Sequence, residues 1–165
     1  VARGGARGAA DEATSATGPA AGAIDATSYE AAMLSRIQNE LFDLGADLAT
    51  PPDIQFGFGP HEMALRIVPS QIARLENEID AMNDNLDALK SFILSGGTAA
   101  AARLHLARAV TRRAERAGIA AGAARKLNPL ALSYLNRLSD HLFVLTRHLN
   151  AAAGGDILWK PGAPG

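Results

Sequence analysis

Apolar residues recur alternately three and four positions apart in three separate stretches of this sequence. The stretches run over residues 34–48, 72–93 and 135–149. This spacing places the apolar side chains along one side of an α-helix, where they can be buried against other helices. No alternation of apolar and polar residues, typical of strands, accompanies them. The pattern predicts an all-α fold, an up-and-down helical bundle of four to five helices, in a single domain over residues 1–165.

Signals at the ends of these stretches predict where the helices begin. We expect Ser70, which follows Pro69, to cap the second helix through its hydroxyl group. Asn128 and Pro129 give cap and first-turn signals for the third. A further, alanine-rich helix is predicted from about Thr98 to Lys126. The three apolar stripes are Leu34, Ile37, Leu41, Leu44 and Leu48; Ile72, Leu75, Ile79, Met82, Leu86, Leu89 and Ile93; and Leu135, Leu138, Leu142, Leu145 and Leu149.

The remaining segments are less regular. Residues 9–24 have a helical composition, but Gly18 and Pro19 lie inside them. An interior proline costs a helix about 3 kcal/mol, so we expect a broken or short helix there. Residues 50–69 are rich in proline and glycine and predict a long connection across the bundle. Residues 154–165 predict a C-terminal tail.

Charge and composition exclude several classes of protein. Sixteen Lys and Arg residues against seventeen Asp and Glu give a net charge of −1, so bulk attraction to nucleic acid or to an anionic membrane is not expected. Without cysteine there is no disulfide framework and no thiolate metal site. Because no apolar run is long enough to span a bilayer and the first residues do not resemble a secretory signal, we expect a cytoplasmic protein. The sequence does not begin with Met, so we expect further residues upstream.

An arginine ladder stands out in the segment LHLARAVTRRAER, residues 104–116. Arg108, Arg112 and Arg116 are four residues apart, so they share one helix face and repel by roughly 0.2–0.5 kcal/mol per pair. The ladder is either a solvated face or a site for phosphate or carboxylate groups, which the arginine fork matches. Glu115 is the only acid in this helix and, three residues after Arg112, can bind one guanidinium group.

The next helix adds polar residues beside its leucine stripe. Asn136 and Asp140 are four residues apart. Spacing alone leaves two alternatives open: Asn136 contacts a ligand, or it pairs with Asp140 at a polar edge between helices. The histidines are too scattered to predict a metal site. The sequence also lacks a phosphate-binding GxxxxGK[ST] loop, a GxSxG elbow and an HExxH motif.

Five segments, in order, closely resemble the PduO-type ATP:cob(I)alamin adenosyltransferases. They are SRIQNELFDLGADLATP, SFILSGG, LHLARAVTRRAER, YLNRLSDHLFVLTRHLN and DILWKPG, and the resemblance runs from about Ala6 to the end. It implies a five-helix bundle that assembles as a homotrimer with active sites between subunits. It also implies transfer of the 5′-deoxyadenosyl group of ATP to the cobalt of cob(I)alamin, giving adenosylcobalamin and triphosphate, with magnesium accompanying the nucleotide.

The resemblance also assigns residue roles. Arg108 matches an arginine that pairs across the subunit interface with an aspartate, which corresponds to Asp11. Phe92 matches the aromatic residue that closes the lower face of the corrin and disfavours the lower axial ligand. These three are the expected catalytic residues, and Phe92 is also the expected cobalamin-binding residue. The expected nucleotide-binding residues are Arg112, on the ATP phosphates, Asn136, and Glu115 and Arg116 of the RRAER motif. No residue is assigned as a metal ligand.

One family element has no counterpart in these 165 residues. It is the N-terminal nucleotide loop, of the type TRTGDDGTTGL, which cradles the triphosphate. The leading hypothesis remains the adenosyltransferase. The first alternative is a non-catalytic member that keeps the trimeric bundle and binds a corrinoid or delivers it to an adenosylcobalamin-dependent acceptor enzyme. A third possibility is a helical interaction module whose arginine face docks on an acidic protein or RNA.

Overall fold

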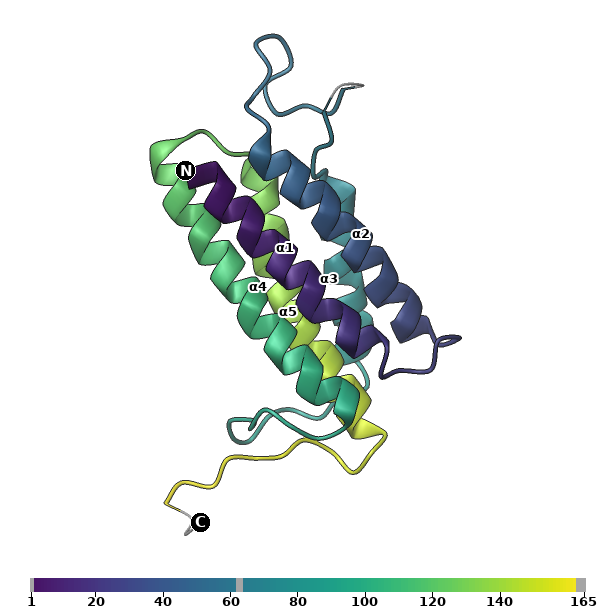
Figure 1. Cartoon of the computed structure of the whole chain (residues 1–165). Coiled ribbons are helices and arrows are strands. Elements are labelled where there is room, and N and C mark those ends of the chain that lie inside the picture. The colour runs from purple at the N-terminus through teal and green to yellow at the C-terminus, as the bar shows by residue number, and fades with distance from the viewer. Residues whose placement is uncertain (1, 62–63, 163–165) are drawn as a thin grey trace.

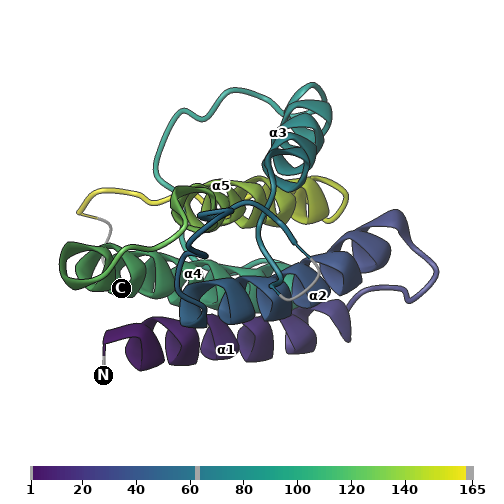
Figure 2. The same cartoon turned by 90° about the horizontal axis from the view of Figure 1, so that it is seen from above.

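Five helices form the protein in the computed structural model, which describes residues 2–61 and 64–162. They are α1 (Ala2–Ala21), α2 (Tyr29–Ala49), α3 (Pro69–Asn83), α4 (Ala99–Ala124) and α5 (Pro129–Ala151). The helices run up and down (Figure 1): α1 packs on α2 and α4, α4 also packs on α5, and α5 carries α3 on its other side (Figure 2). Among the described residues, strand-like pairing is limited to isolated bridges. The predicted all-α bundle is confirmed.

The core follows the first and third apolar stripes. All five stripe residues of α2, Leu34 to Leu48, are at most 1% exposed. On α5 the stripe is fully buried from Leu135 to Leu145, and Leu149 packs at its margin. Burial of such side chains stabilises the fold by roughly 1.5–3 kcal/mol each. Both helices therefore bury an apolar face in the core.

The expectation of a broken or short first helix was wrong. Helix α1 is continuous over 20 residues and passes through Pro19. Proline lacks an N–H, but Pro19 stands in the last turn, so only the carbonyl of Ser15 loses its helical donor. Alanines bury the inner face of α1 and let it lie close to α2 and α4; they are Ala6, Ala10, Ala13 and Ala20. This packing offsets the local cost of the proline.

The second stripe was predicted too long and with the wrong cap. Helix α3 begins at Pro69 with Val68 as its N-cap, whose N–H donates to the side-chain oxygen of Gln71 at 2.9 Å. The helix ends at Asn83 because the residues Asn83-Asp84-Asn85 favour turns over helix interiors. Leu86, Leu89 and Ile93 of the stripe therefore lie in the loop of residues 84–98.

Helix α4 begins at about Thr98, as predicted, and α5 begins where its cap signal predicts. The Thr98 hydroxyl accepts a hydrogen bond from the N–H of Ala101 at 3.1 Å, and the Asn128 carbonyl oxygen accepts one from Leu130 at 3.1 Å. Helix α4 continues through Gly118, where a Cβ atom would lie 2.6 Å from Leu132 Cδ2. The glycine thus permits α4 and α5 to approach closely.

The long connection between α2 and α3 is anchored by a buried carboxylate. Asp47 accepts hydrogen bonds from Arg66 Nη1 at 2.8 Å, from the Ile67 N–H at 2.8 Å and from Asn128 Nδ2 at 2.6 Å. These bonds tie the end of α2, the end of the connection and the start of α5 together. In residues 2–61 and 64–162, no helix has the length and hydropathy required to cross a membrane.

Candidate active site

The centre of the candidate site is the nearly buried carboxylate of Glu115 on α4. One of its oxygens accepts a hydrogen bond from Arg112 Nη1 at 2.8 Å, the contact that the three-residue spacing predicted. The other accepts one from Asn136 Nδ2 on α5, also at 2.8 Å. The Glu115 side chain is 10% exposed, whereas that of Arg112 is 53% exposed. Glu115 therefore orients a guanidinium group whose remaining donors face outward.

Asn136 does not pair with Asp140, so that alternative was wrong. Asp140 instead accepts a hydrogen bond from Arg137 Nη1 at 3.0 Å. Glu115 and Asn136 line an open cavity of about 580 Å³, together with the first turns of α3 and α5. With one N–H committed to Glu115, Asn136 keeps its carbonyl oxygen for a ligand in this cavity.

The other arginines of residues 108–116 differ in what they contact. The Arg108 guanidinium lies 5.3 Å from the ring centroid of Phe143 on α5, a cation–π contact. Arg113 forms an ion pair with Glu12 on α1, which spacing within one helix could not predict. Arg116 is exposed and forms no hydrogen bond or ion pair with the described residues. The repulsion within the ladder is thus offset at Phe143 for Arg108 and at Glu115 for Arg112.

Asp11 and Arg108 are not brought together within one chain. Asp11 is exposed on α1, and its Oδ1 lies 3.8 Å from the point where a Cβ on Gly45 of α2 would stand. Arg108 instead faces α5. In the described part of the chain no ion pair joins them. Their predicted pairing between subunits stays a prediction.

Phe92 projects from the loop of residues 84–98 at one end of the bundle. It is 76% exposed, and its ring meets the edge of Trp159 at a centroid distance of 5.9 Å. The C-terminal tail pairs with the part of the loop around Phe92, and we call this pairing the ribbon. The Trp159 N–H donates to Phe92 O at 2.7 Å, and the Leu94 N–H donates to Ile157 O at 2.8 Å. The ribbon presents an exposed aromatic face.

His105 is buried one turn before Arg108 on α4. Burial, and then the charge of Arg108, lower the pKa of His105, while nearby Asp156 opposes them. Its Nε2 atom is buried without a hydrogen-bond partner in the described residues.

A buried polar network between α2, α3 and α5 was missed from the sequence. Glu78 accepts hydrogen bonds from Arg36 Nη2 at 2.7 Å and lies 2.8 Å from His141 Nε2. Burial acts to raise the pKa of Glu78, but His141 and Arg36 outweigh it and hold the pKa below its ordinary value. Burial, followed by the charge of Glu40, raises the pKa of Tyr134 well above its ordinary value. His141 lies directly before Leu142 of the leucine stripe, and a histidine beside that apolar face is the signal that could have revealed this network.

The comparisons with known proteins agree on one family. The sequence model described as cobalamin adenosyltransferase matches residues 2–149. A corrinoid adenosyltransferase of Mycobacterium tuberculosis is 47% identical over 154 residues, which are 92% of this chain and 77% of that protein. Another, of Bacillus subtilis, is 39% identical over 133 residues, covering 80% of this chain and 65% of that protein.

Solved structures of similar fold point to the same family as the sequence relatives. A variant of the PduO-type ATP:corrinoid adenosyltransferase from Lactobacillus reuteri, complexed with cobalamin and ATP, superimposes with a TM-score of 0.85. It is 35% identical, and the match covers 97% of this chain and 87% of that chain. A second variant of that enzyme, complexed with ATP, gives a TM-score of 0.84 at 34% identity, with 97% of this chain and 88% of that chain covered. The chain therefore belongs to the cobalamin adenosyltransferase family, as its motifs predict.

Proposed function

We propose that this protein transfers the 5′-deoxyadenosyl group of ATP to the cobalt of cob(I)alamin. The observation that carries the proposal is the Arg112–Glu115–Asn136 network beside an open cavity, in a chain of this family. The network combines a cation for phosphates with an amide group that can bind a nucleotide. The products are adenosylcobalamin and triphosphate.

The reaction needs no nucleophile from the protein. The electron pair of Co(I) attacks C5′ of the ribose and forms the cobalt–carbon bond. The C5′–O bond breaks, and its electrons leave with the triphosphate, so cobalt is formally oxidised to Co(III). The protein must align the two substrates and stabilise the charge that accumulates on the leaving group.

Arg112 and Arg116 supply that positive charge. Glu115 fixes Arg112 at 2.8 Å, which lowers the cost of ordering its side chain when phosphate binds. Arg116 is exposed and has no partner among the described residues, so its whole guanidinium group is available. Asn136 then contacts the nucleotide through its carbonyl oxygen. These roles explain why the row contains only one acid.

Phe92 supplies an apolar wall for the corrin. Its 76% exposure leaves the ring free to cover a flat ligand. An apolar face beneath the cobalt excludes water and a lower axial ligand, which favours the reduced, four-coordinate cobalt.

Assembly and magnesium complete the proposal. We propose a homotrimer in which Arg108 pairs with Asp11 of a neighbouring subunit; both lack an ionic partner within the described chain. Magnesium would accompany ATP. Among the described residues no group of three or more His, Asp or Glu side chains is placed to hold a metal ion. An adenosylcobalamin-dependent acceptor enzyme is the proposed recipient of the product.

The visible spectrum of cobalamin tests this function directly. The full-length protein is incubated with ATP and chemically reduced cobalamin, and we expect conversion of cob(I)alamin to adenosylcobalamin. Arg112→Ala should lose ATP affinity, whereas Arg103→Ala, an exposed arginine of the same helix, should retain it. Cobalamin binding without conversion would instead support the non-catalytic, corrinoid-delivering alternative. Unchanged ATP affinity in Arg112→Ala would contradict the assigned phosphate contact.

A further inference from the structure

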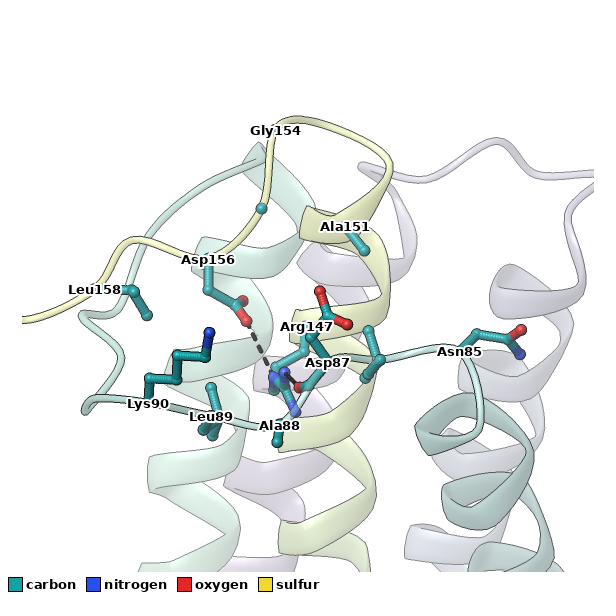
Figure 3. Close-up of a pocket in the computed structure, with 12 residues that line it drawn as sticks. Asn85, Asp87, Ala88, Leu89, Lys90, Arg147, Ala151, Gly154, Asp156 and Leu158 are labelled. Atoms are coloured by element: carbon teal, nitrogen blue, oxygen red, sulfur yellow. Dashed lines mark hydrogen bonds and ion pairs between the residues drawn. The ribbon is translucent and has the colours of Figure 1, made fainter.

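Three parts of the chain meet around Phe92, two of them consecutive in sequence. They are the loop of residues 84–98, the last turns of α5 and the C-terminal tail, all at the same end of the bundle (Figure 1). They surround a cavity of about 640 Å³ (Figure 3). The contacts that hold the loop at this end of the bundle therefore also set the position of the Phe92 ring.

Arg147 of α5 binds both the loop and the tail. Its Nε donates to Asp156 Oδ2 at 3.0 Å, and its Nη2 donates to the carbonyl oxygen of Asp87 at 2.6 Å (Figure 3). The side chains of Arg147 and Asp156 are only 11% and 12% exposed, so the pair is shielded from water and from salt. We call Arg147, Asp156 and the Asp87 carbonyl the Arg147 clasp.

The tail is shaped to deliver Asp156 to this position. Gly154 and Gly155 adopt φ angles of 100° and 95°, which other residues rarely take, and turn the chain back after α5. The Gly155 N–H donates to Asn150 O at 2.8 Å and closes the turn. Beyond Asp156, the tail forms the ribbon with residues 92–94, and the Ser91 hydroxyl donates to Trp159 O at 2.8 Å. A displacement of Asp156 would therefore reach Phe92 through three hydrogen bonds.

The other end of the loop is held independently. Asn150 Nδ2 donates to Gly96 O at 3.2 Å, and its Oδ1 accepts the Thr98 N–H at 3.0 Å. Helix α5 thus grips the loop at both ends, through Arg147 before Phe92 and through Asn150 after it. Between them the ribbon with the tail sets the orientation of the ring.

The cavity itself is a weaker candidate for a ligand site. Arg147, its most buried cation, already donates to two protein acceptors. Lys90 lines the cavity but is exposed and belongs to the loop. Arg147 thus serves the fold of the ribbon rather than an anionic ligand.

We propose that Arg147 is a positioning residue for cobalamin, acting through Asp156 and the Asp87 carbonyl to hold Phe92 against the corrin. The inference rests on the proposed adenosyltransferase function, because it gives a role to the Phe92 wall. It makes a prediction for the protein without substrate as well, since the chain has a single tryptophan and Trp159 contacts Phe92. The emission of Trp159 therefore reports the ribbon directly.

The test compares Arg147→Met, Arg147→Lys and Asp156→Asn with Lys90→Met, which lines the same cavity but forms no part of the clasp. We expect Arg147→Met and Asp156→Asn to shift Trp159 emission to longer wavelength and to lower its anisotropy. With substrates, kcat should fall and KM for cob(I)alamin should rise, so that kcat/KM for cob(I)alamin falls by about tenfold to a hundredfold. The KM for ATP should stay within about twofold of the wild-type value. Arg147→Lys keeps the charge but not the planar fork, so it should recover part of the loss. Lys90→Met should match the wild type.

Two outcomes would overturn the proposal. One is unchanged Trp159 emission and kinetics in Arg147→Met. The other is a changed Trp159 emission without a specific effect on cobalamin. This would be seen as unchanged kcat and unchanged KM for cob(I)alamin, or as an equal rise in KM for ATP, and either pattern would make the clasp merely structural. If the wild type binds cobalamin but does not convert it, the proposed function fails separately. Arg147→Met is then judged by cobalamin affinity, measured from the quenching of Trp159, which must weaken for the clasp to stand.

Discussion

The four arginines of residues 108–116 differ in what each side chain touches. Arg108 lies over Phe143, Arg112 binds Glu115, and Arg113 binds Glu12. Only Arg116 is without such a contact among the described residues. A solvated face would not need a nearly buried carboxylate at its centre, since surface ion pairs contribute only about 0–1 kcal/mol. Glu115 is therefore the residue that converts the ladder from a repulsive surface into an oriented site.

Glu115→Gln should weaken ATP binding without unfolding the protein. The glutamine keeps the shape but loses the charge, and its amide nitrogen would face the donor of Arg112 or of Asn136. A hydrogen bond to a charged group is worth about 1.5–3 kcal/mol, so we expect a loss of at least tenfold in affinity, measured by calorimetric titration with ATP. The matched control is Asp140→Asn, a carboxylate-to-amide change in an exposed i,i+3 pair with Arg137. Equal affinities for Glu115→Gln and the wild type would remove Glu115 from the nucleotide site.

His105 should make the stability of the protein depend on pH between about 5 and 7. Because its pKa is lowered in the folded state, the unfolded chain binds more protons in this range. Stability is then fully present above the ordinary histidine pKa of 6.5 and is lost as the pH falls below it. The groups that act on His105 are Arg108, which opposes protonation, and Asp156, which favours it.

Urea unfolding at a series of pH values measures this effect. In His105→Gln the free energy of unfolding should change less between pH 7 and pH 5 than in the wild type. The lowered pKa of Glu78 changes the free energy of unfolding mainly below its ordinary value of 4.5, which lies outside the range of pH 5 to 7. Parallel pH profiles for the two proteins would show that burial does not disfavour protonation of His105.

At the scale of helices, the sequence predicted the elements whose signals are local. The α2 and α5 stripes, the start of α4 and the Asn128 cap depend on local signals within one segment, and each was confirmed. Helix α1 was predicted as broken or short because Pro19 lies inside it, whereas the packing of its alanines on α2 and α4 outweighs the proline. Helix α3 was overextended because an apolar stripe continues past the turn-forming residues 83–85.

The contacts of the candidate site likewise differ in whether a local signal in the sequence predicts them. The Arg112–Glu115 contact follows from a spacing of three residues and was predicted. The bond from Asn136 to Glu115 joins two helices, and its geometry depends on how α4 and α5 pack. The Arg147 clasp joins residues of a loop, a helix and the tail, so periodicity carries no signal for it.

The junction between the loop and α4 depends on Gly97. Its φ angle is 97°, and a Cβ atom there would lie 2.2 Å from Asn150 Oδ1. Gly97→Ala should therefore break the grip of Asn150 on the loop and lower the free energy of unfolding by about 2 kcal/mol or more. Gly122→Ala is the opposite case, because this exposed α4 glycine has open space around it, and it should stabilise by up to about 1 kcal/mol. Urea titrations of both variants check the two signs, and a stable Gly97→Ala would contradict the assigned strain.

For the whole molecule, the up-and-down order of the helices distributes the site along α4. The helix starts beside the loop that carries Phe92 and runs toward the opposite end of the bundle (Figure 1). Arg108, Arg112 and Arg116 follow in that direction, about 6 Å apart. The proposed corrin wall therefore lies beside the start of α4, and the proposed phosphate-binding arginines follow along that helix.

Light scattering tests the proposed trimer. The wild type should have about three times the chain mass of 17.1 kDa. Arg108→Asp and Asp11→Arg should each place like charges together at the interface, which weakens association by about 2 kcal/mol or more, so both should dissociate on dilution before the wild type does. The double variant restores opposite charges and should recover the trimer and its ATP affinity.

The control is Glu12→Gln, because Glu12 neighbours Asp11 but forms its ion pair with Arg113 of the same chain. It should leave the assembly unchanged. A monomeric wild type would contradict the trimer itself. A double variant as weak as either single variant would contradict the proposed contact between Arg108 and Asp11. Recovery of both the trimer and ATP binding would place the two charges across one subunit boundary.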